Sequence, residues 1–447
     1  MILWRRMSGA RPEVSGPCRP GTGRNSPNTR STPARCLTAW LPRTGRCLSP
    51  RSMGRWFVWL SLRPKQATRL IGASDTAGRR MPGWQNQKRG RDCLDAGKGS
   101  VMNKFRIIQV GSSGWGESWL QFIHESPDWE LAGLVSRGGD QLRAAQEKWN
   151  IPAQRVFDSL EKALAAPGDV VLIAAPHHLH VPMARQALAA GRNVLIEKPL
   201  SDNFDEARAL ADFARGCKGR AWVSQNYRYR EGLWRLHRSL AEGRLGRLIS
   251  IRLNFRRAGK NKPGPWAQEW RRQQWSFLLN ELVIHHFDMC RFLSGNDAEW
   301  IFCDAWKHPW NESAGPESAA AVIRFNDGWT LDFDGHARTI GGPTTEFGGD
   351  WLVQTDHGCA LWNGGDVEWS PVQGEESELA DAEGFPGFDR AGVLNELAAA
   401  IQGKPTRVLP TLEDNLRSLA MVFAAIHSAQ EGRVVKMSEL LTPPGSM

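Results

Sequence analysis

The sequence has no apolar run of the roughly 20 residues that a transmembrane helix requires. It has no disulfide framework either, because the four cysteines after residue 101 are scattered singly, as is typical of reduced thiols in a cytosolic protein. Tyrosine is scarce, with 2 residues against 21 tryptophans, a bias for which we derive no mechanism. These absences exclude a membrane-spanning or disulfide-stapled protein, and we expect a cytoplasmic one with no membrane partner.

Acidic residues are scarce in the first 101 positions. The chain holds 57 Lys and Arg against 47 Asp and Glu; residues 1–101 hold 20 and 4, which leaves 37 and 43 for the rest. This segment is rich in Arg, Pro, Gly and Ser and lacks periodicity, which predicts a disordered basic extension. A basic arm can bind nucleic acid, but the segment has no repeat or zinc-ligand spacing, and we expect no nucleic-acid partner. An alternative start of the natural protein at Met102, directly before the first predicted strand, stays open.

Short apolar strands alternate with amphipathic helices over residues 102–226. We predict strands at 104–110, 129–135, 155–157, 170–174, 193–196 and 221–225, and helices at 119–124, 142–149, 160–165, 181–190 and 204–215. Continuous β-branched runs such as Val170 to Ala174 are typical of parallel strands buried on both faces. The alternation predicts an α/β fold, with a doubly wound dinucleotide-binding (Rossmann) domain over residues 102–226.

A glycine-rich turn directly follows the first predicted strand. It consists of Gly111, Ser112, Ser113, Gly114, Trp115 and Gly116. The dinucleotide fingerprint G-x-G-x-x-G needs a tight turn, close approach to a pyrophosphate and a close helix-to-strand contact. Gly111 and Gly116 fill the first and third places, whereas Ser113 takes the second. With a strand before it and a helix after it, the turn predicts a cofactor site, although an ordinary glycine-rich turn is the alternative.

The strand at 129–135 ends in Ser136 and Arg137. At this point an acidic residue would bind the ribose 2′-hydroxyl of NAD, whereas an arginine accommodates the 2′-phosphate of NADP. The cofactor is therefore expected to be NADP or NAD, with NADP favoured. Asp140 lies close enough in sequence to bind a ribose hydroxyl, so NAD remains the alternative cofactor.

Glu197, Lys198 and Pro199 follow the strand at 193–196, at the carboxyl edge where parallel sheets bind ligands. Pro199 restrains the backbone, so Lys198 should leave the strand in a defined pose. A lysine over a partly desolvated cleft can donate to a carbonyl or alkoxide oxygen, and its pKa can be lowered. This predicts proton-transfer chemistry, against the alternative of a solvated charged loop.

The second half, residues 227–447, predicts an α+β domain. Period-2 alternation indicates strands at 248–256, 319–325, 329–335, 350–354, 358–362 and 367–370, and helices are expected at 389–402 and 413–430. Glu281, His285 and Asp288 stand at i, i+4 and i+7 of a predicted helix, so a carboxylate and an imidazole would share one face and Asp288 could orient the histidine. That is the arrangement of a general base with its supporting groups; surface ion pairing is the alternative.

The order of these motifs resembles the Gfo/Idh/MocA oxidoreductases. The resemblance rests on the glycine turn, on P-x-x-x-H from Pro176 to His180 and on the E-K-P unit, and residues 280–288 look like the family's D-x-G-x-H-x-x-D segment. It implies a Rossmann domain followed by a domain with a large, mainly antiparallel open sheet, helices on one sheet face, and a homo-oligomer, a dimer or tetramer. Glu281 stands where the family usually has aspartate.

The resemblance also implies an activity: hydride transfer between NADP(H) or NAD(H) and a secondary alcohol carbon of a sugar, cyclitol or related polyol. Lys198 would donate to the reacting oxygen, His285 would act as acid and base, and Glu281 would orient or charge that pair. Further cofactor contacts are expected from Pro176, His177, His180, Glu197 and Gln225. No metal is expected, because the histidines near Pro176 lack a cysteine or carboxylate at ligand spacing. The alternative function is a sensor that binds NAD(P) or sugar without turnover.

Overall fold

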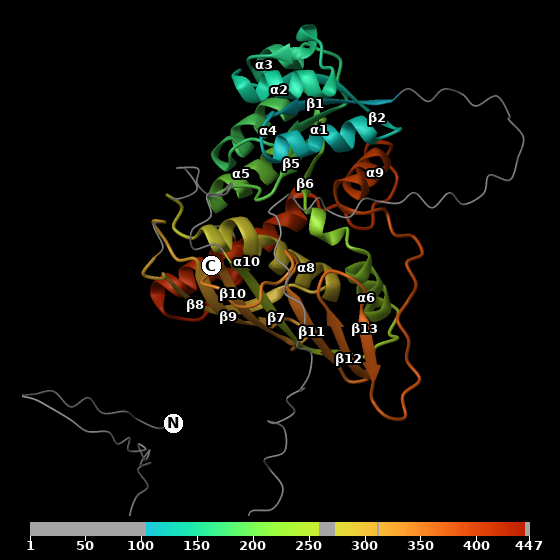
Figure 1. Ribbon diagram of the computed structural model, residues 1–447, viewed down its shortest axis with the longest axis vertical. Helices are drawn as coiled ribbons and strands as arrows, with labels where there is room; N and C mark the ends of the chain where they lie inside the picture. Colours follow the sequence, from blue (N-terminus) through green and yellow to red (C-terminus); the bar gives the residue numbers. More distant parts are fainter. Residues whose placement is uncertain (1–103, 259–272, 311–312, 443–447) are drawn as a thin grey trace, which may run out of the picture. The chain divides into compact units, whose positions relative to one another are not determined.

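The computed structural model describes residues 104–258, 273–310 and 313–442 (Figure 1). The predicted extension 1–101 and the alternative start at Met102 lie outside these residues. No helix in the described part of the chain is long and apolar enough to cross a membrane.

The amino-terminal sheet is six-stranded and parallel, with the order β3-β2-β1-β4-β5-β6. Its strands are β1 (Phe105–Val110), β2 (Trp129–Val135), β3 (Val156–Phe157), β4 (Val170–Ile173), β5 (Asn193–Glu197) and β6 (Ala221–Ser224). The connecting helices are α1 (Trp115–Glu125), α2 (Asp140–Trp149), α3 (Leu160–Leu164), α4 (His180–Ala189) and α5 (Phe204–Ala214). This order is that of a doubly wound dinucleotide-binding sheet, whose switch point lies between β1 and β4. The predicted Rossmann domain is confirmed.

Burial explains the central strands. All four residues of β4 are fully buried, as are Val194 to Ile196 of β5, so β-branched side chains fill both faces of the sheet. Helix α5 begins with a side-chain cap, in which the Asn203 side chain accepts from the Glu206 backbone N–H. The carboxyl ends of β1, β4 and β5 therefore meet at one rigid edge.

The second sheet is eight-stranded, with the order β13-β12-β11-β7-β10-β9-β8-β14. Its strands are β7 (Leu248–Ala258), β8 (Ala298–Trp306), β9 (Ser318–Phe325), β10 (Thr330–Thr339), β11 (Asp350–Thr355), β12 (Gly358–Trp362), β13 (Glu368–Pro371) and β14 (Val435–Lys436). β7 and β10 pair in parallel, and the other neighbours pair antiparallel. The mainly antiparallel sheet is confirmed; β8, β14 and the parallel pair are additions that the sequence interpretation did not contain.

One face of this sheet is covered by helices of the second half, namely α6 (Glu231–Ala241), α8 (Ile284–Ser294) and α10 (Leu412–Glu431) (Figure 1). Helix α9 (Asp389–Ile401) packs against α1 instead, and the short α11 (Ser438–Leu441) lies against β14. A wide π-helical turn, Leu278–Val283, precedes α8. Side chains on the strands alternate accordingly, as in β9, where Ala321 and Ile323 are buried and Val322 is exposed. The domain limits 102–226 and 227–447 stay predictions.

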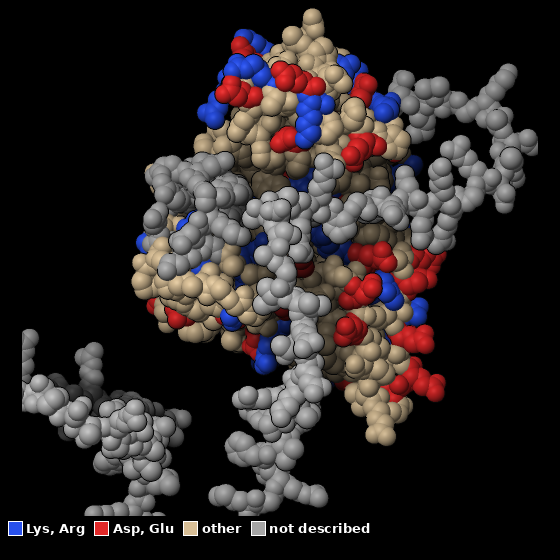
Figure 2. Space-filling view, viewed as in Figure 1, with Lys and Arg blue, Asp and Glu red and all other residues tan. Residues whose placement is uncertain are grey.

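Charge is mixed on the molecular surface. On the face drawn in Figure 2, acidic and basic side chains of the described residues intermingle over the Rossmann sheet and its helices. This agrees with the slightly acidic balance of the chain after residue 101.

Candidate active site

The turn after β1 needs its glycines. Gly111 has φ +100°, and a Cβ there would lie 2.3 Å from the carbonyl oxygen of Ala174 at the end of β4. A Cβ on Gly116 would lie 2.5 Å from the carbonyl oxygen of Gly111. Gly111 therefore permits the turn between neighbouring strands, and Gly116 lets α1 approach β1, which are the first and third roles of the fingerprint.

Hydrogen bonds from Gln109 hold the same turn, whereas the space around Gly114 is open. The Gln109 side chain donates to the carbonyl oxygens of Gly111 and Gly116, both at 2.7 Å. Gly114 has φ +55°, and a Cβ there would meet no heavy atom within 4 Å. Helix α1 begins at the next residue, Trp115, and the first N–H groups of a helix have no intrahelical partner. These residues fit a dinucleotide, because a helix N-terminus behind an open glycine turn suits a pyrophosphate.

The end of β2 lies beside this turn. The Ser112 and Ser136 hydroxyl oxygens are 2.9 Å apart, so the residue that follows β2 is held against the glycine turn. Arg137 and Ser113 are exposed, as is Trp115. Asp140 is exposed and forms an ion pair with Arg143 at the start of α2.

Glu197, at the end of β5, is buried and directed toward helices. Its carboxylate accepts a hydrogen bond from the Trp119 indole on α1 at 2.8 Å, and the Arg390 side chain on α9 lies 3.8 Å away. The Arg390 guanidinium also lies 5.1 Å from the Trp115 ring and 5.4 Å from the Trp119 ring. Glu197 thus ties the strand end to α1 and α9.

His180 joins two strand ends. It is fully buried, and its ring nitrogens lie 2.8 Å from the carbonyl oxygens of Pro199 and Ala175. Burial lowers its pKa. His180 therefore acts on the site by holding the chain after β4 against the chain after β5.

Lys198 links the two halves of the site. Its side chain is buried, and Nζ donates to the backbone carbonyl of Glu281 in the π-helical turn at 2.9 Å. The same nitrogen lies 6.0 Å from the centre of the Trp115 ring. The E-K-P unit and the 280–288 segment, which the sequence interpretation treated as one site, therefore do meet.

The Glu281 carboxylate pairs with His177. Its Oε1 lies 3.2 Å from His177 Nε2, and both side chains are buried, at 3 % and 5 % exposure. Pro176 precedes His177 and ends the extended segment after β4. Glu281 thus reaches Lys198 through its backbone and His177 through its carboxylate.

His285 is a buried, neutral imidazole. Its ring stacks on Tyr227 at 4.1 Å between centroids, and its Nδ1 is buried without a hydrogen-bond partner in the described part of the chain. Burial, followed by the positive charge of Lys198, lowers the pKa of His285 well below its usual value. A neutral imidazole beside a lysine can accept a proton.

Asp288 does not orient His285, so that prediction was wrong. Its carboxylate accepts two hydrogen bonds from Arg228, both at 2.7 Å, and one from the Ser418 hydroxyl, also at 2.7 Å. The physical reason is that Arg228 offers a bidentate, charge-assisted partner on the side of α8 to which Asp288 points. Asp288 therefore binds Arg228 and Ser418 and not His285.

Two site residues were missed from the sequence. Tyr227 follows β6 in the segment that also supplies Gln225, whose buried amide has no hydrogen-bond partner in the structure's described ranges. Arg390 comes from α9, far along the chain, and no motif marks it. Among the described residues, no group of three His, Cys, Asp or Glu side chains is arranged to hold a metal ion.

Comparison with known proteins identifies the chain. Residues 105–225 match a family described as "Oxidoreductase family, NAD-binding Rossmann fold", and residues 233–350 match the "GFO/IDH/MocA C-terminal domain". A myo-inositol 2-dehydrogenase of Thermotoga maritima is 22% identical over 317 residues, which are 68% of this chain and 89% of that protein.

Solved structures share the fold. An Agrobacterium radiobacter oxidoreductase in complex with NAD+, L-tartaric acid and magnesium has a TM-score of 0.67 at 19% identity, covering 76% of this chain and all of the other. The WlbA dehydrogenase of Bordetella pertussis, in complex with NADH and UDP-GlcNAcA, has a TM-score of 0.65 at 20% identity, covering 76% and 99%. With its two family domains in sequence, this chain belongs to the Gfo/Idh/MocA family of NAD-binding oxidoreductases.

Proposed function

We propose that the protein transfers a hydride between a nicotinamide dinucleotide and a secondary alcohol carbon of a sugar, cyclitol or related polyol. The observation that carries this proposal is the convergence of β5 and α8. Lys198 Nζ, at the end of β5, donates to the Glu281 carbonyl just before α8 at 2.9 Å, and the buried Nδ1 of His285 in the first turn of α8 has no hydrogen-bond partner among the described residues. The names of relatives point the same way, since one is a myo-inositol 2-dehydrogenase and another a glucose-6-phosphate 3-dehydrogenase.

The roles follow from the chemistry of the two side chains. Neutral His285 accepts the hydroxyl proton during oxidation and returns it during reduction. Lys198 carries three N–H donors; one binds the Glu281 carbonyl and fixes the ammonium, and another can donate to the substrate oxygen. Glu281 positions this lysine through its backbone. The bound nicotinamide supplies the hydride acceptor or donor.

The cofactor contacts are proposed from the same geometry. Residues 111–116 would bind the pyrophosphate, because the open turn and the start of α1 present N–H groups there. Pro176 and His177 would border the nicotinamide side, with Gln225 and its unpartnered amide nearby. Glu197 and His180 would act through packing, since both are buried behind the strand ends.

We also propose that NADP is preferred over NAD. The residues after β2 are Ser136 and Arg137, and Ser136 is held at the glycine turn through Ser112. The exposed Arg137 can pair with a 2′-phosphate, whereas Asp140 is engaged by Arg143.

A homo-oligomer is proposed through the open face of the eight-stranded sheet. Phe302 on β8 and Val322 on β9 are register neighbours, and their side chains are 41 % and 40 % exposed. The family resemblance implies that a second subunit covers this open face, and two adjacent exposed apolar side chains on it are compatible with burial there. A dimer or a tetramer can use this face.

The test is cofactor binding followed by turnover. Quenching of tryptophan fluorescence measures the Kd of NAD and NADP for the full chain, and a panel of polyols is then followed at the absorbance of the reduced nicotinamide. The proposal expects tight binding and turnover of at least one polyol. Failure of both cofactors to bind would contradict it, and tight binding with no turnover would favour a sensor.

A further inference from the structure

Arg230 directly precedes α6, and its guanidinium lies over two aromatic rings. Its guanidinium carbon lies 4.9 Å from the centre of the Tyr227 ring and 4.5 Å from the centre of the Phe388 ring. The side chain is 24 % exposed, so it is partly open to solvent. Stacking on aromatic faces fixes a guanidinium plane while leaving its N–H edge available.

The N–H edge of Arg230 makes no hydrogen bond within the described ranges of the chain. One carboxylate oxygen of Asp389 lies 3.7 Å from it, beyond hydrogen-bond distance. The other Asp389 oxygen already accepts from the Asn226 side chain and the Arg390 backbone N–H, both at 2.8 Å, and from the Arg390 guanidinium at 3.2 Å. Asp389 is thus an ion-pair partner of Arg230 but accepts its hydrogen bonds from other groups, and Arg230 keeps its N–H donors for a ligand.

Arg230 stands next to the reacting groups. Tyr227, on which it stacks, itself stacks on His285 at 4.1 Å. The charge of Arg230 is also one of the influences that lower the pKa of His285, after burial and after Lys198, His286 and Arg390. A group bound at Arg230 would therefore sit one aromatic ring away from the catalytic imidazole.

Cations outnumber carboxylates around this position. Besides Arg230, both Arg390 and Arg257 act electrostatically on Tyr227, whereas Asp389 is the one carboxylate among the strongest influences. Arg390 is compensated by Glu197 and Asp389, and Arg257 donates to the Thr345 carbonyl at 2.9 Å. Arg230 shares the single carboxylate of Asp389 with Arg390, so a positive charge remains in excess here, and an anionic group would complement it better than a neutral polyol.

We propose that Arg230 binds an anionic substituent of the substrate, so that the protein acts on polyols that carry a carboxylate or a phosphate. The fork of the guanidinium matches two oxygens of either group in a bidentate pair. The substituent would lie on the Tyr227 side of His285, remote from the hydroxyl that is oxidised. This inference rests on the proposed dehydrogenase function and narrows its substrate class.

The test measures binding, so it does not depend on finding the natural substrate. The full chain, saturated with the cofactor that binds more tightly, is titrated with D-glucose, D-glucuronate and D-glucose 6-phosphate while tryptophan fluorescence is followed. We expect at least one acidic probe to bind roughly 10- to 100-fold more tightly than glucose, the value of a charge-assisted bidentate pair. Tighter binding of D-glucuronate would indicate a carboxylate site, and tighter binding of D-glucose 6-phosphate would indicate a phosphate site.

Three variants make the test specific. Arg230→Met should abolish the preference for acidic probes. Arg230→Lys should retain part of it, because the lysine ammonium keeps the positive charge but cannot form the bidentate pair of a guanidinium. Arg244→Met is the matched control, since it removes one positive charge from an exposed position paired with Glu242. It should leave the preference unchanged. Thermal melting and cofactor Kd confirm that each variant is folded.

Acidic probes that bind no more tightly than glucose would overturn the inference, as would a preference that survives in Arg230→Met. Either result, with normal cofactor binding, would leave the dehydrogenase proposal intact. Loss of cofactor binding in the unmodified protein would instead contradict the proposed function itself.

Discussion

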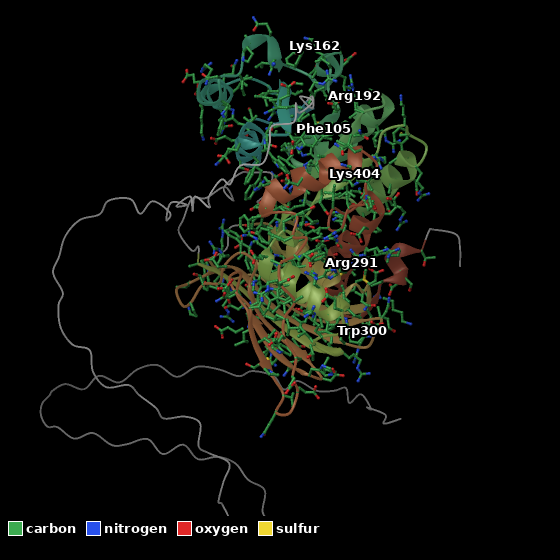
Figure 3. The ribbon with its side chains drawn as sticks, turned by 90° about the vertical axis from the view of Figure 1, so that its right-hand side faces the viewer. Phe105, Lys162, Arg192, Arg291, Trp300 and Lys404 are labelled. Atoms are coloured by element: carbon green, nitrogen blue, oxygen red, sulfur yellow. The ribbon has the colours of Figure 1, made fainter. Side chains whose placement is uncertain are left out.

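Replacing Asp288 by asparagine separates a structural from a catalytic role. Asp288 is 1 % exposed and receives both arms of the Arg228 guanidinium. Arg228 reaches Asp414 as well, at 2.8 Å, and Arg291 on α8, labelled in Figure 3, binds Asp414 at 2.9 Å. The cluster joins the segment after β6 to α8 and α10, so its loss should affect folding rather than proton transfer.

The size of the effect follows from what Arg228 would lose. Removing one partner of a buried ion pair costs about 3–5 kcal/mol, because the remaining charge is left uncompensated. Arg228 would keep Asp414 and the Val408 carbonyl, so the lower end, about 3 kcal/mol, is expected. At roughly 2–4 °C per kcal/mol for a domain of about 200 residues, Tm should fall by about 6–12 °C.

Differential scanning calorimetry at a fixed scan rate measures the Tm, and initial rates at a temperature well below it measure turnover. Asp381→Asn is the control, because Asp381 is exposed and pairs with Arg238 on the surface; it should change stability by less than about 0.5 kcal/mol. A variant Asp288→Asn with unchanged Tm and a turnover reduced a hundredfold would refute the structural assignment and restore Asp288 as a group that orients His285.

Three further predictions concern the cofactor and pH. Gly111→Ala places a Cβ 2.3 Å from the Ala174 carbonyl oxygen at φ +100°, and calorimetric titration should show cofactor affinity reduced at least tenfold. Arg137→Ala should weaken NADP selectively, and equal losses for NAD and NADP in fluorescence titrations would contradict its assignment to the 2′-phosphate. Burial alone would raise the pKa of Asp414, but Arg228 and Arg291 lower it to about 2; the stability that this carboxylate contributes is present above the unfolded pKa of roughly 4 and should be lost between about pH 4 and pH 2 in acid-unfolding curves.

The amino-terminal half of the fold was predictable because its signals are local. Buried runs such as Val170 to Ile173 and the glycine turn after β1 each specify their own conformation, and the family resemblance supplied their order. The second sheet was predicted strand by strand, yet the parallel pairing of β7 with β10 depends on contacts across 80 residues that no local period encodes. Helix α6 was overlooked although Leu233, Leu236 and Leu240 stand at helical spacing.

The site residues also divide into those marked by a local sequence signal and those placed by contacts between distant segments. Lys198 was predictable because the E-K-P unit ends a strand at the sheet edge where ligands bind. The partners of Glu281 and Asp288 were not, since a π-helical turn cannot be distinguished from α-helix by spacing and the competing residues His177 and Arg228 come from other segments. Arg390 reaches the site only through the packing of α9 against α1.

The turnover of Lys198→Ala tests the central claim most directly. Lys198 Nζ is held by the Glu281 carbonyl and acts on His285, so its removal should lower kcat by roughly two to four orders of magnitude. The Kd of the cofactor should change by less than about threefold, because pyrophosphate binding is assigned to residues 111–116. Turnover close to that of the unmodified protein, with the same polyol and cofactor, would contradict the assignment of Lys198 to the reacting oxygen.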